Sequence, residues 1–395
     1  MMLPNGWKKV KLGDVAKVTS GGTPLRTQTE YWNGDIPWVK TAQIQNRHIS
    51  LDQVDEYITE KGVEESSAKI VPKGTLLMAM YGQGKTRGQV AMLDFDASIN
   101  QACAAFHLNK SCIIVDYLYQ FFLFEYENIR NMSNSGGQKN LSAEIIKNIT
   151  IVLPPLNEQK KIAEMLSVWD KAIEKTEKLI EAKELFFKKN LEDCIYAPAK
   201  NNQWKIEKLG NLSQMSSGGT PKSSVKEFYD GDILWASIAD MTEQGMYVSH
   251  TAKTLTQLGV DNSAAKVYPK GTVLYAMYAS IGEVSIAVYD MASSQAILGI
   301  QVGERLLNKY LYYFLVGQKE RIKLQGQAGT QSNLNAGMVR DFDIPLPSIS
   351  EQEKIVHFFD LFEKEIDVLK EQLDNYKKQK QGLMQKLLIG QWRVK

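Results

Sequence analysis

The stretch PKGTLLMAMY at residues 72 to 81 returns as PKGTVLYAMY at residues 269 to 278, with eight of the ten positions identical. The two stretches lie 197 residues apart. The same offset aligns three further pairs of features: SGGTP at 20 to 24 with SGGTP at 217 to 221, Trp7 with Trp204, and Gly13 with Gly210. A constant offset across separate motifs indicates an internal repeat, and a repeat decides the architecture of a chain. We therefore expect two copies of one domain.

The composition fits this expectation. The chain has 395 residues, of which 44% are hydrophobic and 23% charged, as is typical of soluble globular proteins. No apolar run approaches the roughly 20 residues that a membrane helix needs. The first residues, MMLPNGWKKVKLGD, lack the apolar core of a signal peptide. The sequence predicts a cytoplasmic protein with no membrane partner.

Motifs for metal or cofactor chemistry are weak. Cys103, Cys112 and Cys194 form no CxxC pair, and the four histidines lack metal-ligand spacing. The stretch GQGKT at 82 to 86 ends like a phosphate-binding loop, but Ala79 stands where that pattern requires its first glycine. We therefore expect no catalytic centre, no metal and no cofactor in this chain.

Charge gives a weak indication of a partner. The net charge is only +2, yet both repeats open with a basic stretch. The cations are Lys8, Lys9, Lys11, Lys17 and Arg26 in the first copy, and Lys200, Lys205, Lys208, Lys222 and Lys226 in the second. A solvated surface explains either stretch alone, whereas their recurrence favours a shared anionic partner.

Each repeat ends in a run without glycine or proline, from residue 160 to about 191 and from 353 to 381. These runs predict long helices, with Asn157 as the N-cap of the first and a capping box of Ser350 and Glu353 in the second. Their apolar residues alternate in steps of four and three, which is the seam of a coiled coil. The predicted seam consists of Ile162, Leu166, Trp169, Ile173, Ile180 and Phe187 with Ile355, Phe359, Phe362, Ile366, Leu369, Leu373 and Tyr376. Lone surface helices are the alternative, but a rod of about 45 Å is too long for one small domain.

Between the long helices, short β-rich runs such as GDIPWV, GTLLMAMY and GQVAML indicate strands. One further helix is expected in each copy, over residues 115 to 131 and 308 to 324, followed by a polar loop. The sequence therefore predicts a mixed α and β fold.

The order of these motifs along the whole chain resembles the specificity subunit of type I restriction-modification systems. The matching features are W-x4-L-G at Trp7 and Trp204, the SGGTP, GDI and PKGT motifs, the helix starts LPPLNEQKKIAEML and PLPSISEQEKIVHFF, and the terminal KQGLMQKLLIGQWRV. The resemblance implies an α+β fold in which two repeated α/β target recognition domains are separated by an antiparallel two-helix coiled coil with pseudo-two-fold symmetry. It divides the chain into target recognition domain 1 (1–152), a first helix (153–197), target recognition domain 2 (198–345) and a second helix (346–395).

The resemblance also implies a function. Such a subunit is not catalytic, and it reads a bipartite, asymmetric target in double-stranded DNA. It recruits two modification subunits that methylate adenine at N6, together with restriction subunits, and S-adenosylmethionine, ATP and Mg belong to those partners. The alternatives are a stand-alone enzyme, a related DNA-binding protein that acts alone, and a scaffold that ignores DNA.

We expect the DNA contacts on polar and glycine-rich loops, at positions where the two copies differ. The first copy offers Thr23, Arg26, Lys40, Thr41, Gln43, Tyr81, Gln83, Lys85, Arg87, Gln138, Lys139 and Asn140. The second copy offers Thr220, Lys222, Ser237, Asp240, Tyr278, Ser280, Gln331, Ser332 and Asn333. The motif positions that both copies share are expected to be structural, since glycine serves tight turns.

Overall fold

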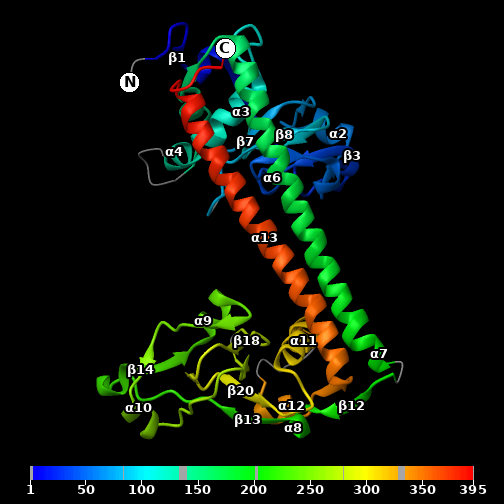
Figure 1. Cartoon of the computed structure of the whole chain (residues 1–395). Coiled ribbons are helices and arrows are strands. Elements are labelled where there is room, and N and C mark those ends of the chain that lie inside the picture. The colour runs from blue at the N-terminus through cyan, green and yellow to red at the C-terminus, as the bar shows by residue number, and fades with distance from the viewer. Residues whose placement is uncertain are drawn as a thin grey trace. The chain divides into compact units, whose positions relative to one another are not determined.

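The computed structural model describes residues 3–82, 84–132, 140–200, 203–278, 280–327 and 334–394. Their contacts divide the chain into two compact units (Figure 1). Unit 1 comprises Met1–Glu177 with Gln372–Lys395, and unit 2 comprises Lys178–Glu371. Each unit contains one copy of the repeat and a segment of both long helices, so the units cut through the helices instead of separating helices from recognition domains.

The elements of the first copy run in the order β1 (Lys8–Lys11), α1 (Leu12–Val15), β2 (Ala16–Ser20), β3 (Trp32–Val39), β4 (Arg47–Ile49), β5 (Tyr57–Ile58), α2 (Glu60–Glu64), β6 (Ile70–Val71), β7 (Leu76–Ala79), β8 (Val90–Leu93), β9 (Ala97–Ile99), β10 (Cys103–Leu108), α3 (Val115–Phe124), α4 (Tyr126–Asn131), α5 (Ala143–Lys147), β11 (Thr150–Leu153) and α6 (Leu156–Leu191). The single helix expected over residues 115 to 131 is thus interrupted at Glu125, between α3 and α4.

The elements of the second copy run in the order α7 (Ala197–Lys200), β12 (Lys205–Lys208), α8 (Leu209–Leu212), β13 (Ser213–Ser217), β14 (Tyr229–Ala236), α9 (Ile238–Gln244), β15 (Tyr247–Val248), β16 (Thr254–Leu255), α10 (Gln257–Asp261), β17 (Val273–Ala276), β18 (Val284–Ala287), β19 (Ala292–Ser293), β20 (Ile297–Val302), α11 (Asn308–Gln327), α12 (Ala336–Arg340), β21 (Asp343–Leu346) and α13 (Ile349–Leu388). Among the described elements, the second copy follows the order of the first with four differences: α7 and α9 are additional helices, β6 has no counterpart strand, and α11 alone stands where the first copy has α3 and α4.

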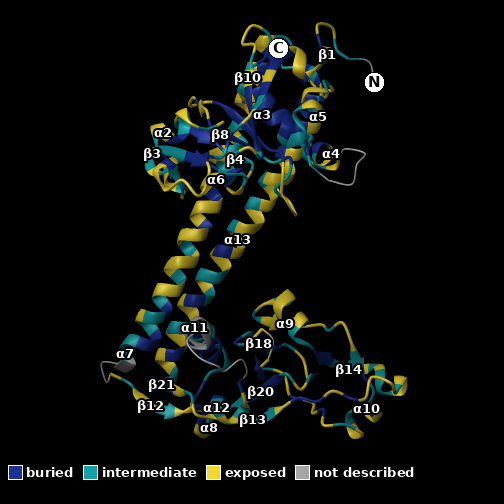
Figure 2. Ribbon diagram, turned by 180° about the vertical axis from the view of Figure 1, so that it is seen from behind, coloured by how far each residue is buried: buried dark blue, intermediate teal, exposed yellow. Residues whose placement is uncertain are grey.

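The sheets repeat in the same way. Unit 1 has a five-stranded sheet in the order β2-β10-β7-β8-β4, and unit 2 has one in the order β13-β20-β17-β18-β15. The repeated PKGT stretch therefore leads into the central strand of each sheet, β7 or β17, which is buried along its whole length. A smaller sheet, β5-β3-β9-β6 or β16-β14-β19, stands beside it. Figure 2 shows the buried strands of both units in dark blue.

One helix of each copy closes the core over the large sheet. In unit 1, Tyr117 and Phe122 of α3 are fully buried in one cluster with Leu76 and Met78 of β7. The hydroxyl of Tyr117 donates to the carbonyl of Val152, 2.6 Å away. In unit 2, the hydroxyl of Tyr310 on α11 donates to the carbonyl of Pro345, 2.8 Å away. The repeat therefore preserves buried polar contacts as well as the strand order.

The SGGTP loops are structural, as the sequence suggests for shared motif positions. A Cβ atom on Gly22 would lie 2.3 Å from the carbonyl carbon of Ser67, and one on Gly219 would lie 2.2 Å from that of Ala264. The backbone carbonyls of these two glycines accept hydrogen bonds from the indoles of Trp38 and Trp235, at 3.0 and 2.9 Å. Only glycine allows so close an approach of two backbones.

Both long helices begin earlier than the sequence suggests. Helix α6 begins at Leu156, so Asn157 lies inside the first turn and is not the N-cap. Helix α13 begins at Ile349, and its capping box is formed by Ser348 and Glu351, not by Ser350 and Glu353. The expected caps are therefore both wrong by two residues.

The two long helices run antiparallel in each unit. In unit 1, Lys377 of α13 pairs with Glu177 of α6 at 2.7 Å, and Lys380 pairs with Asp170 at 2.5 Å, so the residue number rises along one helix as it falls along the other. In unit 2, Phe187 contacts Phe359 at 5.2 Å, and Lys370 pairs with Glu184 at 2.7 Å. Within unit 2 the residue number falls along one helix as it rises along the other, which defines antiparallel pairing.

The predicted seam residues are less exposed than the residues between them. Five are buried: Ile162, Leu166, Ile180, Phe359 and Ile366. The others are partly buried: Trp169, Ile173, Phe187, Ile355, Phe362, Leu369, Leu373 and Tyr376. Ile162 and Leu166 join the core of unit 1, which also contains Met384 and Leu387 from the end of α13. The seam therefore packs partly against a recognition domain and not only against the other helix. None of the described helices combines the length and apolar character needed to cross a membrane.

Candidate nucleic-acid interface

Three of the sequence-predicted residues, Arg26, Lys40 and Gln43, meet at the edge of the smaller sheet in unit 1. Two acids join them. The Nζ atom of Lys40 lies 2.9 Å from a carboxylate oxygen of Asp55 and 2.6 Å from one of Glu56. Arg26 pairs with the other oxygen of Glu56 at 2.5 Å, and the amide nitrogen of Gln43 donates to Asp55 at 2.8 Å. We call these five residues the charged cluster.

The local fold explains why the charged cluster forms. Strand β3 ends at Val39, and the backbone amide of Lys40 then donates to the side-chain oxygen of Gln43, which fixes the turn. The guanidinium of Arg26 lies 3.9 Å from the ring centroid of Trp32, so a cation–π contact holds it over β3. Asp55 and Glu56 lie just before β5, the antiparallel neighbour of β3. Pairing of the two strands thus brings the acids to the cations.

The pKa values of the charged cluster follow from these contacts. The hydrogen bond from Lys40 lowers the pKa of Asp55, and hydrogen bonds from Arg26 and then Lys40 lower the pKa of Glu56. Burial opposes the charge of Lys40, but its hydrogen bonds to both acids outweigh that effect and raise its pKa. All four groups are therefore charged at neutral pH.

The matched place in unit 2 begins with the same capping contact, but it continues as the helix α9, where the first copy has only a short 3-10 helix at Thr41–Gln43. The backbone amide of Ser237 donates to a carboxylate oxygen of Asp240 at 2.8 Å, just as Lys40 donates to Gln43. The other oxygen of Asp240 accepts from the backbone amide of Ala252 at 2.8 Å. Ala252 and Lys253 stand where the first copy has Asp55 and Glu56. The two units thus present different hydrogen-bonding groups from one frame.

A second group of predicted residues lies at the end of β7. The guanidinium of Arg87 donates to the backbone carbonyl of Arg130 at 2.7 Å, and the Arg130 guanidinium donates to the carbonyl of Gly84 at 2.7 Å. These bonds tie the loop to the end of α4. Lys85 and Tyr81 have exposed side chains, whereas the guanidinium of Arg87 is engaged by the backbone. Lys85 is the better placed cation of this loop.

The polar loop before α5 returns to the same place. The amide of Leu141 donates to the carbonyl of Met80 at 2.9 Å, so the partly buried Asn140 lies next to the β7 loop. In unit 2 the amide of Leu334 donates to the carbonyl of Met277 at 3.1 Å, beside the exposed Tyr278. The structure therefore brings together two loops that are far apart in sequence.

The other predicted residues are distributed over the same two regions. Thr23 and Thr41 are partly buried, and Thr220, Lys222 and Ser280 are exposed. Gln83, Gln138, Lys139, Gln331, Ser332 and Asn333 lie outside the described residues. In unit 1 the helix α4 and the strand β3 lie on opposite sides of β8 in both views (Figures 1 and 2), so the candidates form two separate groups and not one patch.

Two cations in the basic opening of the second copy, Lys205 and Lys208, are paired with acids. Lys208 pairs with Asp343 at 2.7 Å, and Glu207 pairs with Lys205 at 2.7 Å and Arg305 at 2.9 Å. Hydrogen bonds from Arg305 and Lys205 lower the pKa of Glu207 to about 2. These contacts favour a structural role for Lys205 and Lys208, whereas Lys222 and Lys226 of the same stretch are exposed.

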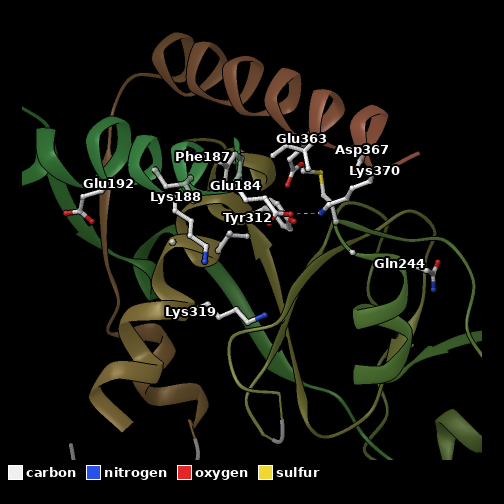
Figure 3. Close-up of a pocket in the computed structure, with 16 residues that line it drawn as sticks. Glu184, Phe187, Lys188, Glu192, Gln244, Tyr312, Lys319, Glu363, Asp367 and Lys370 are labelled. Carbon is white, nitrogen blue, oxygen red and sulfur yellow. Dashed lines mark ion pairs between the residues drawn. The ribbon is translucent and has the colours of Figure 1, made fainter. Parts of the chain in front are cut away.

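Each unit also has a cavity where its recognition domain meets the long helices. The cavity of unit 2 has a volume of about 620 Å³ (Figure 3). Carboxylates and lysines from α6, α11 and α13 line it, with Lys370 paired to Glu184. Burial raises the pKa of Glu363, one of its lining carboxylates, to about 7. A cavity of about 530 Å³ lies in unit 1, and its acids include Asp94, Asp116, Glu164, Asp170 and Glu174. In the unit 1 cavity these acids outnumber the lining lysines, Lys160 and Lys171, so an anionic ligand is disfavoured there.

Sequence reasoning missed the residue that fixes each long helix to its domain. The side-chain oxygen of Gln159 accepts from the amide of Ile114 at 2.9 Å, and its nitrogen donates to the carbonyl of Pro154 at 2.8 Å. Gln352 makes the same two bonds with Leu307 and Pro347 in unit 2. Both glutamines are completely buried. The signal was present in the sequence, since both helix starts contain the dipeptide Glu-Gln.

The part of the chain that the structure describes contains no group of three or more His, Cys, Asp or Glu side chains arranged to hold a metal ion. Cys103, Cys112 and Cys194 are free thiols, and burial raises the pKa of the Cys103 thiol.

Comparison with known proteins agrees with this architecture. The family model of the type I restriction modification DNA specificity domain matches residues 4–184 and again residues 201–376. The type I restriction enzyme MjaIX specificity subunit of Methanocaldococcus jannaschii is 25% identical over 99% of this chain and 95% of its own length. The EcoR124I/EcoR124II specificity subunit of Escherichia coli is 29% identical over 42% of this chain and 40% of its own length.

Solved structures show the same fold. A chain of a type I R-M system, described for its complex assembly and conformational transition, superposes with a TM-score of 0.63 at 17% identity, covering 99% of this chain and 100% of that one. The type I restriction-modification S subunit from M. genitalium gives a TM-score of 0.59 at 16% identity, covering 98% of both chains. The duplicated domains, the paired long helices and both family matches lead to one conclusion: this chain belongs to the family of type I restriction-modification DNA specificity subunits.

Proposed function

We propose that this chain is the non-catalytic subunit that selects the DNA target of a type I restriction-modification complex. Its target is bipartite and asymmetric, with one half-site for each repeat. The observation that carries this proposal is the capping contact that follows β3 and β14 in both units, which begins at Lys40 in one unit and at Ser237 in the other. A common frame with different side chains suits two related domains that read different bases.

The chemistry of these side chains supports base reading. Lys40 and Ser237 are the members of this turn that can reach a base edge, because Gln43 and Asp240 are buried and their side chains are already hydrogen-bonded within the domain. A lysine donates to the acceptors of guanine, and a serine hydroxyl can bond to more than one base, both in the major groove. Contacts from exposed Lys85 and Lys222 to phosphates position the domains without reading sequence. Each half-site therefore depends on the side chains of one unit.

The same chain recruits two modification subunits and, through the assembled complex, restriction subunits. Support comes from apolar residues that the described part of the chain leaves uncovered on α6 and α13. Met165 and Val168 are 39% and 64% exposed, and the matched Phe358 and Leu361 are 37% and 55% exposed. Because the patch recurs at the same positions, one kind of partner fits both copies. S-adenosylmethionine, ATP and Mg act in these partners.

Methylation-site sequencing of the assembled enzyme tests the assignment of half-sites. Lys40→Ser with Gln43→Asp installs the residues of the second copy in the first, and should change the bases of the first half-site alone. Ser237→Lys with Asp240→Gln is the matched variant, and should change only the second half-site. Altered bases in both half-sites from either variant would show that the repeats form one composite site.

A further inference from the structure

Asp55 and Glu56 restrain Lys40, which the proposed function assigns to the first half-site, and its neighbour Arg26. We propose that these acids are specificity-determining residues. They position Lys40 and Arg26 to contact a base edge, and they reduce the binding of these two cations to the phosphates of DNA of any sequence. This inference rests on the proposed function and adds to it a pair of residues that themselves contact no DNA.

We call the ion pairs that Asp55 and Glu56 form with Lys40 and Arg26 the tether. The ammonium group of Lys40 has three donors, and two of them are directed at carboxylate oxygens of Asp55 and Glu56. The side chain of Lys40 is 24% exposed, so its position is fixed on several sides. Glu56 uses one oxygen for Lys40 and the other for Arg26. Lys40 therefore retains one donor in a defined direction, which suits a single acceptor such as O6 or N7 of guanine.

The charges of the cluster balance. Two cations face two carboxylates, and all four groups are charged, so the cluster as a whole carries no net charge. Non-specific affinity for DNA comes from cations that neutralise phosphates and release counterions. A cation that already faces a carboxylate releases fewer counterions, and the carboxylate repels the phosphate. The tether therefore lowers affinity for random DNA more than affinity for the cognate base.

The second copy has no such tether at the matched positions. Ala252 replaces Asp55, and the exposed Lys253 replaces Glu56. Asp240 there accepts hydrogen bonds from backbone and hydroxyl groups and does not hold a lysine among the described contacts. Effects of changing Asp55 and Glu56 should consequently be confined to the first half-site.

The test uses the full chain assembled with its modification subunits. Asp55→Asn with Glu56→Gln should strengthen binding to a random duplex at low salt. It should also steepen the salt dependence, with about three- to fourfold more affinity lost between 50 and 200 mM salt for each freed cation. Methylation-site sequencing should show a degenerate first half-site and an intact second one. Glu30→Gln is the control, because it frees Lys61 in the same domain, 2.8 Å from Glu30 and outside the cluster.

The single variant Asp55→Asn keeps the test valid if the double variant does not fold, since the Asp55 side chain is 63% exposed. If the double variant shows an unchanged salt dependence and an intact first half-site, the proposal that Asp55 and Glu56 determine specificity is wrong. An effect of Glu30→Gln as large as that of the double variant overturns it too. Failure of the proposed function looks different, because the wild-type complex would then methylate no bipartite site.

Discussion

Glu363 lies where the recognition domain of unit 2 meets α13, and its ionisation should weaken the fold. Its carboxylate is 3.1 Å from the hydroxyl of Tyr313, which also lies 2.8 Å from a carboxylate oxygen of Asp360. That hydroxyl has a single hydrogen, so both carboxylates cannot accept it at once. Burial, opposed by the bond from Tyr313 and reinforced by Asp367 and Asp360, raises the pKa of Glu363 from an ordinary 4.5 to about 7, although Lys309 is near.

The magnitude follows from the size of this change. One pKa unit corresponds to about 1.4 kcal/mol, so a fully ionised Glu363 costs the folded state about 3 kcal/mol. The folded state binds more protons than the unfolded state between pH 4.5 and about 7. The free energy of unfolding therefore falls as pH rises through this window, and no further loss from this group occurs above it.

Glu363→Gln should remove that loss. The amide has the shape of the protonated carboxyl and can donate to the oxygen of Tyr313. The free energy of unfolding of the variant minus that of the wild type should rise by roughly 2 to 3 kcal/mol between pH 5 and pH 8.

Urea denaturation followed by circular dichroism at several pH values measures this difference, and hydrogen exchange in α11 and α13 locates it. Glu371→Gln removes a charge from an exposed position of α13 and controls for net charge. A difference that does not change with pH, or a variant that is less stable than the wild type at pH 8, refutes the reasoning.

Two further predictions concern packing and assembly. Gly219→Ala should destabilise unit 2 by several kcal/mol, because its Cβ would lie 2.2 Å from the carbonyl carbon of Ala264. Thermal melting should show the loss, and a variant as stable as the wild type would contradict the close approach of the two backbones. Val168→Asp with Leu361→Asp should weaken association with the modification subunits at least tenfold. The melting temperature of the free chain should stay nearly unchanged, since both side chains are exposed. Size-exclusion chromatography of mixtures measures the association, and undiminished complex formation would exclude this surface as the binding site.

The fold was largely predictable because the same motifs occur twice in the sequence, once in each copy of the repeat. The stretch PKGT followed by apolar residues occurs in both copies, and in both it enters the central strand of a five-stranded sheet. The glycines of SGGTP were assigned to structure for the same reason, and the close backbone approaches at Gly22 and Gly219 confirm that assignment. Positions that the two copies share form the common backbone framework, and positions that differ supply the side chains that this framework displays.

The starts of the long helices were predicted less well, and the reason is local. Two patterns of Ser-x-x-Glu overlap at 348 to 353, so either one can form a capping box. The structure selects Ser348 and Glu351. Gln352 must lie inside the first turn to bond the amide of Leu307 and the carbonyl of Pro347, which excludes the later start. A long-range contact thus decides between two caps that are equivalent in sequence.

The candidate interface was predictable only in part, because sequence shows which residues are able to contact DNA and not which are already engaged. Arg87 and Lys85 are equivalent candidates by position, yet the guanidinium of Arg87 is bonded to the carbonyl of Arg130. Asp55 and Glu56 are inconspicuous in sequence, and their importance comes from strand pairing between β3 and β5. The charge next to a reading side chain is therefore set by a neighbouring strand.

The side chains of the turn and the acids next to them lie on different segments, so the specificity of such a chain can change in two ways. The turn that begins at Lys40 or Ser237 is held by a hydrogen bond from its first backbone amide to the side-chain oxygen of Gln43 or Asp240, so the first residue can change while this capping contact is kept. The acids on the adjacent strand are a second, independent variable, because Asp55 and Glu56 contact the turn only through side chains. If the proposed function holds, a substitution on the turn should change which base is read, and one at Asp55 or Glu56 should change how strongly random DNA competes. A frame that allows both to vary separately can acquire a new half-site while the other repeat keeps its own.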